Sequence, residues 1–180
     1  MTTTASNPAA YYLRLAGILL AICVVVSGLL GVTNLITADR IDAIKAEKTN
    51  ASMQEVLPSE HYEPLAYSGE DPLVKAIYQA DGGYVVEVTP SGFGGELDLV
   101  VGVSADGSVT GVSIISHSET SGLGANATKE GFRSQYIGKT GTLAVSKDGG
   151  EIDALTGATI TSRAVTSGVN AALAAAADLG

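Results

Sequence analysis

The feature that most constrains this chain is an uncharged apolar run of 22 residues, LAGILLAICVVVSGLLGVTNLI, from Leu15 to Ile36. As an α-helix the run is about 33 Å long, which matches the hydrocarbon core of a bilayer. The competing interpretation is a cleaved signal peptide. However, the run exceeds the usual apolar region of about 7–15 residues, and no small-residue cleavage site follows it. We therefore predict a membrane-spanning helix over 15–36, behind a short N-terminal segment, 1–14.

Basic residues on both sides of this run give only a weak signal for its orientation. Arg14 and the N-terminal amine precede the run, whereas Arg40, Lys45 and Lys48 follow it. Cytoplasmic flanks carry the excess of Lys and Arg in membrane proteins. Charge alone therefore leans slightly towards a cytoplasmic position for the residues after the helix.

The composition of the chain excludes several classes of function. The formal net charge is −9, and from Thr49 onward 6 basic residues stand against 16 acidic ones. Nucleic-acid binding needs clustered Lys and Arg, so we predict no nucleic-acid partner. Cys23 is the only cysteine, which excludes an intrachain disulfide and a thiolate metal cluster. His61 and His117 lie far apart, and we predict no metal site.

The residues after the apolar run predict one α+β domain on a helical stalk. Residues 37–58 are charged, carry apolar side chains at helical spacing, and end at Pro58, so they predict a helix. Residues 59–180 contain short runs rich in β-branched and aromatic residues between Gly-rich turns, which predict strands of an antiparallel sheet. These runs are VKAIYQA, YVVEVTP, ELDLVVGVS and SVTGVSIISHS.

Turn signals and periodicity complete the predicted domain. The ADG between the last two runs predicts an antiparallel hairpin, and GTLAVSKDGGEIDAL predicts a second, short hairpin-like element. The segment from Ile160 to Leu179 predicts a helix whose small residues let it pack closely on the sheet. Its apolar face is formed by Val165, Val169, Ala172, Leu173 and Ala176.

The stretch DALTGATITS, Asp153 to Ser162, crowds hydroxyl side chains around a Gly-Ala pair where this last helix begins. Small residues let a ligand approach the backbone, and the free N–H groups of a first helical turn favour an anion. The usual phosphate-binding loops are absent, and Arg163 is the nearest basic residue in sequence, so a singly attached phosphate fits best. The alternative is that these threonines only cap the helix. Capping, however, needs only one hydroxyl group, whereas this stretch contains several.

Two segments carry a resemblance to a known family. The stretch DALTGATITS resembles the flavinylation motif D-x-x-[ST]-G-A-T-x-[ST] of FMN-binding domains. A second segment, 117–124, resembles their H-x-E-T-P-G-L-G loop, with Ser121 in place of Pro. The motif positions are Asp153, Thr156, Gly157, Ala158, Thr159 and Thr161. The layout of anchor, stalk, hairpin, loop and final helix resembles the family of Rnf-complex G subunits (RnfG). The C subunit of the Na⁺-pumping NADH:quinone reductase is a longer relative.

The resemblance implies a role for each matched residue. Thr159 would carry FMN through a phosphoester, with Thr156 and Thr161 as hydrogen-bond donors to the phosphate. Gly157 and Ala158 would keep the approach open, and a flavin transferase that takes FMN from FAD would recognise Asp153. In the second segment, Leu123 would pack on the ring, while Thr120 and the N–H groups of Gly122 and Gly124 would bind its polar edge. Glu119 would either face the flavin or shape the loop.

The family also implies a function, an electron-carrying subunit of an ion-translocating ferredoxin:NAD⁺ oxidoreductase in the cell (inner) membrane. Its partners would be the other membrane subunits, and no residue of this chain would be catalytic by itself. The N-terminus would be cytoplasmic and the domain over 59–180 extracytoplasmic, against the lean of the charges. Two alternatives stay open. One is a stand-alone membrane-anchored flavoprotein that reduces an extracytoplasmic acceptor, and the other is a non-redox tethered module that binds a ligand.

Overall fold

The computed structural model describes residues 8–67, 69 and 71–179, so part of the predicted N-terminal segment 1–14 lies outside the described residues. Its first element is helix α1, Pro8–Val56, of 49 residues. The part Tyr11–Ala38 is long and apolar enough to cross a membrane. All side chains from 11 to 36 are exposed. Helix α1 therefore offers lipid an apolar surface in the region where the sequence predicts the span.

Two hydroxyl groups within the apolar part of α1 have partners inside the helix. Thr33 Oγ1 donates to the carbonyl of Leu29 at 2.9 Å, and Thr37 Oγ1 donates to that of Thr33 at 2.8 Å. Such bonds to the preceding turn remove the cost of placing a hydroxyl in hydrocarbon. These two threonines are therefore compatible with a membrane position.

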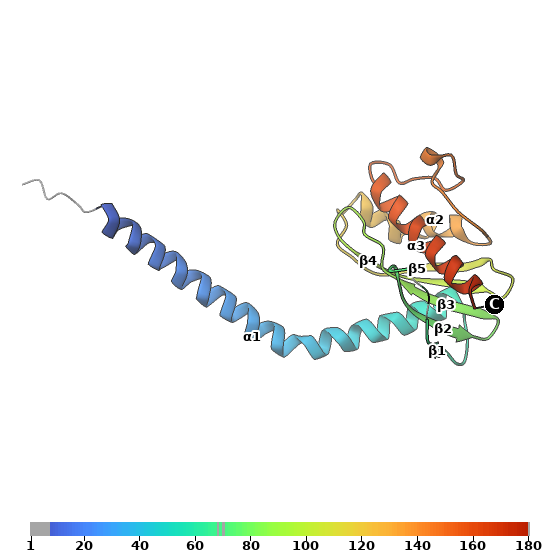
Figure 1. Cartoon of the computed structure of the whole chain (residues 1–180), viewed down its shortest axis with the longest axis horizontal. Coiled ribbons are helices and arrows are strands. Elements are labelled where there is room, and N and C mark those ends of the chain that lie inside the picture. Colours follow the sequence, from blue (N-terminus) through green and yellow to red (C-terminus); the bar gives the residue numbers. More distant parts are fainter. Residues whose placement is uncertain (1–7, 68, 70, 180) are drawn as a thin grey trace, which may run out of the picture. The chain divides into compact units, whose positions relative to one another are not determined.

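The residues from Lys45 onward form a compact unit around one antiparallel sheet. Its described strands follow one another along the sheet in chain order (Figure 1), and all neighbours are antiparallel. The strands are β1 (Glu63–Leu65), β2 (Val74–Ala80), β3 (Gly83–Val88), β4 (Leu97–Ser104) and β5 (Val109–His117). The α+β prediction is confirmed, as are the four long strands and the hairpin between β4 and β5. The short strand β1 was not predicted.

One face of the sheet packs against helix α3, Thr159–Ala177, which crosses β3 and β4 (Figure 1). Alternate residues of a strand point to opposite faces, so Leu99 and Val101 of β4 turn towards this side. Val165 and Val169 of α3 pack in the same core and are fully buried. The helix predicted over 160–179 is thus observed, with its predicted apolar face inward.

The other face of the sheet receives the end of α1. Met53 and Val56 pack against Val100, which points away from α3. The backbones approach so closely that a Cβ on Gly102 or Gly111 would overlap the backbone of Val56. The carbonyl of Val56 also accepts a 2.6 Å hydrogen bond from Thr110 Oγ1. The last turns of the predicted stalk, 37–58, are therefore part of the folded domain.

Between β5 and α3 the chain is irregular and forms only short helical turns. They are η1 (Gly124–Thr128), α2 (Glu130–Arg133), η2 (Ser134–Tyr136) and η3 (Ser146–Asp148). The prediction of a hairpin-like element over 141–155 is wrong. A single parallel bridge joins Val145 to Ile152 there. Gly149 adopts a left-handed conformation, φ 85°, and Gly150 lies against the Ala144 carbonyl, so the chain turns tightly around η3 instead of pairing two strands.

Asp98 on β4 supplies a pH-dependent contribution to stability. It accepts hydrogen bonds from Lys45 Nζ (2.8 Å) and Lys75 Nζ (3.1 Å). Burial alone would raise its pKa, but the bonds from the two lysines outweigh this and hold the pKa of Asp98 below its ordinary value of 3.8. A carboxylate with a lowered folded-state pKa stabilises the fold above its unfolded pKa, and that contribution is lost as pH falls through the folded value.

We expect Asp98→Asn to lower the free energy of unfolding by about 1 kcal/mol at pH 7. The difference from wild type should shrink as the pH falls below 4, because the wild-type carboxylate then becomes protonated. Urea unfolding of the detergent-solubilised chain between pH 7 and pH 3 measures this. Glu96→Gln, an exposed carboxylate two positions earlier, is the control. A difference that stays constant with pH would contradict the assignment.

Candidate functional site

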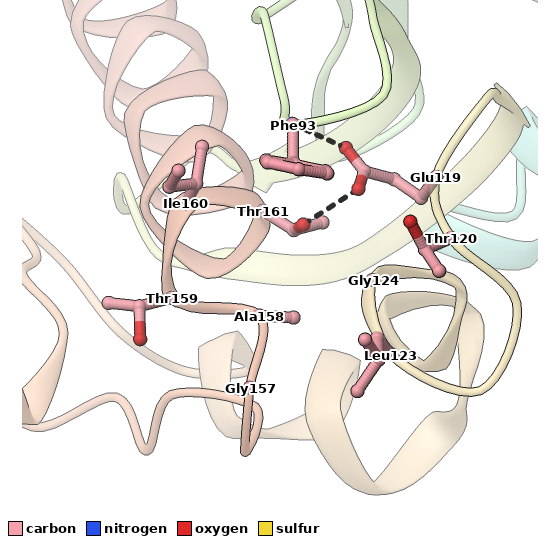
Figure 2. Close-up of a pocket in the computed structure, with 10 residues that line it drawn as sticks. All are labelled: Phe93, Glu119, Thr120, Leu123, Gly124, Gly157, Ala158, Thr159, Ile160 and Thr161. Atoms are coloured by element: carbon pink, nitrogen blue, oxygen red, sulfur yellow. Dashed lines mark hydrogen bonds between the residues drawn. The ribbon is translucent and has the colours of Figure 1, made fainter.

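A cavity of about 350 Å³ lies where the start of α3 meets the loops that follow β3 and β5. Figure 2 shows its lining residues, which come from three separate parts of the sequence. They are Phe93, Glu119, Thr120, Leu123, Gly124, Gly157, Ala158, Thr159, Ile160 and Thr161. This volume lies within the range of roughly 300–1,000 Å³ that is usual for small-molecule sites.

Glu119 is the residue that joins these segments. Its Oε1 accepts a hydrogen bond from the backbone N–H of Phe93 at 2.8 Å, and its Oε2 accepts one from Thr161 Oγ1 at 2.9 Å (Figure 2). The backbone N–H of Gly94 also donates to Oε1, at 3.3 Å. Both Glu119 and Thr161 are buried. A buried carboxylate needs such donors to offset its lost hydration. The carboxylate therefore holds the loop after β3 against the first turn of α3.

Glycines let the loops close around this carboxylate. A Cβ on Gly92 would overlap Glu119 Oε1, and a Cβ on Gly124 would overlap Glu119 Oε2 and crowd Thr161 Oγ1. Gly94 lies equally close to the Ser118 carbonyl. Gly92, Gly94 and Gly124 thus have a packing reason. They permit backbone approach that any side chain would prevent.

The first turn of α3 keeps its N–H groups without a side-chain cap. The cap residue is Ala158, with φ −134° and ψ 46°, and no side-chain cap hydrogen bond is made. The alternative that Thr156, Thr159 or Thr161 caps this helix is therefore wrong. Because uncapped N–H groups and the helix dipole favour negative charge, the Ala158 end of the cavity suits an anion.

The hydroxyl groups near the start of α3 have separate partners. Ser162 Oγ donates to the Ala158 carbonyl at 3.0 Å and accepts from the N–H of Leu155 at 2.9 Å. Thr166 Oγ1 lies 2.8 Å from the hydroxyl of Tyr136, whose pKa burial raises to about 12. Both hydroxyls are thus structural.

Thr159 has a basic partner that the sequence did not indicate. Lys147 Nζ, on turn η3, donates to Thr159 Oγ1 at 2.8 Å. Arg163 instead forms a two-point ion pair with Asp148, at 2.7 and 2.6 Å. Hydrogen bonds from Arg163 hold the pKa of Asp148 below its usual value. The cation that contacts the predicted attachment oxygen is therefore Lys147, not the nearest basic residue in sequence.

The structure brings most of the predicted site residues to one cavity. Thr159, Gly157, Ala158 and Thr161 line it together with the residues of the second predicted segment, Glu119, Thr120, Leu123 and Gly124. Three predicted residues are not among its lining residues. They are Gly122, Thr156 and Asp153, all exposed. An exposed position of Asp153 is compatible with recognition by another protein.

Sequence reasoning missed three residues around the cavity. Phe93 and Ile160 line it and are exposed to 68% and 51%, and Lys147 contacts Thr159. The GFGG turn gave a signal for Phe93, since an aromatic residue between glycines is rarely needed for a turn alone. The sequence held no signal for Lys147, which stands 12 positions before its partner.

Two protein-family models match separate parts of this chain. Residues 92–174 match the model of the FMN-binding domain, and residues 11–56 match the RnfG N-terminal region. The chain is 37% identical over 182 residues to the G subunit of the Na⁺-translocating ferredoxin:NAD⁺ oxidoreductase complex of Acetobacterium woodii, with 87% of each chain covered. It belongs to the RnfG family, the G subunits of ion-translocating oxidoreductase complexes.

Other members of the RnfG family are similar to this chain over half of its length or more. The G subunit of the ion-translocating oxidoreductase complex of Methanosarcina acetivorans is 34% identical over 167 residues, covering 86% of this chain and 89% of that one. The G subunit of a proton-translocating ferredoxin:NAD⁺ oxidoreductase complex from Clostridium ljungdahlii is 51% identical over 94 residues, about half of each chain. The sequence match to RnfG proteins therefore extends over most of this chain.

A solved structure resembles this RnfG family member in fold. The C subunit of the Na⁺-translocating NADH-quinone reductase of Parabacteroides distasonis superposes with a TM-score of 0.52. The two are 21% identical, and the match covers 72% of this chain and 80% of that one. The likeness supports the α+β fold alone.

Proposed function

We propose that this chain is the electron-carrying G subunit of a membrane-bound, ion-translocating ferredoxin:NAD⁺ oxidoreductase, and that it carries an FMN attached to Thr159. The observation that carries the proposal is the cavity formed jointly by the two motif segments. Glu119 Oε2 and Thr161 Oγ1 join them across 42 positions of sequence. The match of residues 92–174 to FMN-binding domains supports the choice of ligand.

The residues around the cavity fit FMN. At one end, the uncapped first turn of α3 and Lys147 offer N–H donors and positive charge beside Thr159, as a phosphate group requires. Elsewhere Phe93, Leu123 and Ile160 offer apolar surface for an aromatic ring system. Gly157, at φ +76°, lies between Leu123 and Thr159 without a side chain (Figure 2). The polar end and the apolar surface thus match the two parts of the cofactor.

A covalent attachment at Thr159 suits an electron carrier. FMN would supply the redox chemistry, while the protein supplies binding and position. Thr159 would hold the phosphate, so that the group is retained through repeated cycles of electron transfer. Glu119 would hold the walls of the cavity in place, and its own oxygens are already used by Phe93, Gly94 and Thr161. Its proposed role is therefore structural.

The anchor places this carrier at a membrane. Helix α1 contains a span long and apolar enough to cross a bilayer. We propose the boundaries 15–36 for the span, 37–58 for the stalk, whose last turns pack on the sheet, and 59–180 for the FMN-binding domain. The domain is extracytoplasmic in this proposal, and 1–14 is cytoplasmic. Partners are the other membrane subunits and, during maturation, a flavin transferase that recognises the exposed Asp153.

The test is to produce the wild-type chain together with a flavin transferase and the other subunits of the complex. The purified chain should remain yellow after denaturation and should gain the mass of one FMN less water. It should also be retained with the other membrane subunits in mild detergent. A yellow chain that purifies alone would favour the stand-alone electron carrier. A colourless chain with an active transferase would favour the non-redox ligand-binding module.

A further inference from the structure

Lys147 stands beside Thr159 because two structural elements are fixed together. Turn η3 carries Lys147, and Asp148 of the same turn pairs with Arg163, which lies one helical turn after Thr159 on α3. The backbone of the turn is held as well, since the N–H of Ser146 donates to the Ile152 carbonyl at 2.7 Å. The position of Lys147 is thus set from both sides.

The charges around Thr159 are divided between these residues. Arg163 and Asp148 neutralise each other through their two-point pair. The ammonium of Lys147 donates instead to a neutral hydroxyl, at 2.8 Å. Because a hydroxyl does not neutralise it, the positive charge of Lys147 acts directly on Thr159 Oγ1. Negative charge that develops on this oxygen, or on a group bound to it, is stabilised there.

We propose that Lys147 assists the attachment of FMN to Thr159 and then binds the resulting phosphodiester. The inference rests on the proposed function. In the attachment, Thr159 Oγ1 forms a bond to the FMN phosphorus of FAD, and the bond from that phosphorus to the oxygen shared with AMP breaks. AMP leaves, and the hydroxyl proton goes to a base of the transferase or to water, with no change of oxidation state. As an ammonium, Lys147 has no lone pair and is not that base.

The role of Lys147 predicts a defined kinetic effect. A donor aimed at the oxygen where charge develops stabilises the transition state more than the ground state. Replacing Lys147 by Met keeps most of the length of the side chain but removes the charge. Because the side chain is exposed, we expect the turnover of the attachment to fall by about 10- to 100-fold, which is less than the roughly 100- to 1,000-fold effect of one buried donor. The KM for the acceptor protein should stay unchanged. Lys147→Arg should restore most of the rate.

The experiment uses the full chain in detergent, produced without transferase, and adds purified flavin transferase and FAD. Intact mass after denaturation, followed over time at several concentrations of the chain, gives kcat and KM for wild type, Lys147→Met and Lys147→Arg. Lys139→Met is the matched control, because Lys139 pairs with Glu151 rather than with Thr159. Urea unfolding of each variant checks that the fold is retained.

Each result decides between the possibilities. A lower kcat for Lys147→Met, with recovery in Lys147→Arg and no change in Lys139→Met, supports the inference. An unchanged kcat overturns it, and a raised KM with unchanged kcat shows that Lys147 only helps the transferase dock. If wild type itself gains no mass, the proposed function fails and the inference fails with it. The wild-type reaction thus separates the two failures.

Discussion

Thr159→Val is expected to abolish covalent FMN completely. Attachment through a phosphoester needs the hydroxyl oxygen of Thr159, which lines the cavity and accepts from Lys147. Valine keeps the β-branched shape but has no hydroxyl, so the start of α3 should be preserved. Intact mass after denaturation, for chains produced with the transferase, should show one FMN on wild type and none on the variant.

Two controls make the result on Thr159 specific. Thr159→Ser retains a hydroxyl at the same position and should still gain FMN, although more slowly. Thr142→Ala removes an exposed hydroxyl outside the cavity lining and should load as wild type does. FMN on Thr159→Val would show that another hydroxyl carries the group. The attachment site would then have to be reassigned.

Glu119→Ala is expected to have the largest effect on stability among the site residues. The change leaves the buried hydroxyl of Thr161 and the N–H of Phe93 without their acceptor. The buried hydroxyl without a partner costs about 1–3 kcal/mol and the half-buried N–H about 1 kcal/mol, so we expect the free energy of unfolding to fall by about 2–4 kcal/mol. Urea unfolding of the chain without FMN measures this, since the bonds belong to the protein itself.

Glu119→Gln separates the effect of the hydrogen bonds that Glu119 accepts from the effect of its negative charge. The amide oxygen can still accept from Phe93 and Gly94, while its NH₂ group faces Thr161 Oγ1 in place of the second oxygen. We expect a loss of about 1 kcal/mol, clearly smaller than that of the alanine variant. Equal and small losses for both variants would show that Glu119 does not hold the two segments together. Equal and large losses would assign the effect to its charge.

Much of the fold was predictable because it rests on local patterns. Strands β2 to β5 alternate or run apolar between Gly-rich turns, and α3 repeats apolar residues at helical spacing, so each element carries its own signal. The short strand β1 has three residues, too few for a period. The false hairpin over 141–155 had turn residues and alternation. There the left-handed Gly149 and the contact of Gly150 with Ala144 closed a tight turn instead.

The candidate site was predictable from motifs, but its contacts were not. The sequence placed Thr159 at a helix start and indicated that Glu119 belongs to the same site. It did not reveal that Thr161 bonds Glu119 or that Lys147 bonds Thr159, because these contacts depend on how irregular loops fold over the sheet. Such loops have no periodicity. Only the structure therefore separates the predicted attachment oxygen of Thr159 from the neighbouring hydroxyl groups, which make structural hydrogen bonds.

Within the described residues, every buried side-chain nitrogen or oxygen has a hydrogen-bond partner, including those of Glu119 and Thr161 at the cavity. The side-chain hydrogen bonds of the described domain are therefore complete without a cofactor. Under the proposed function, a flavin transferase would then act on a folded surface rather than on an extended peptide. A cell with too little of that enzyme would accumulate folded subunits that carry no FMN but still assemble into the complex. Electron flow through the complex would then follow the degree of loading, not the abundance of the protein.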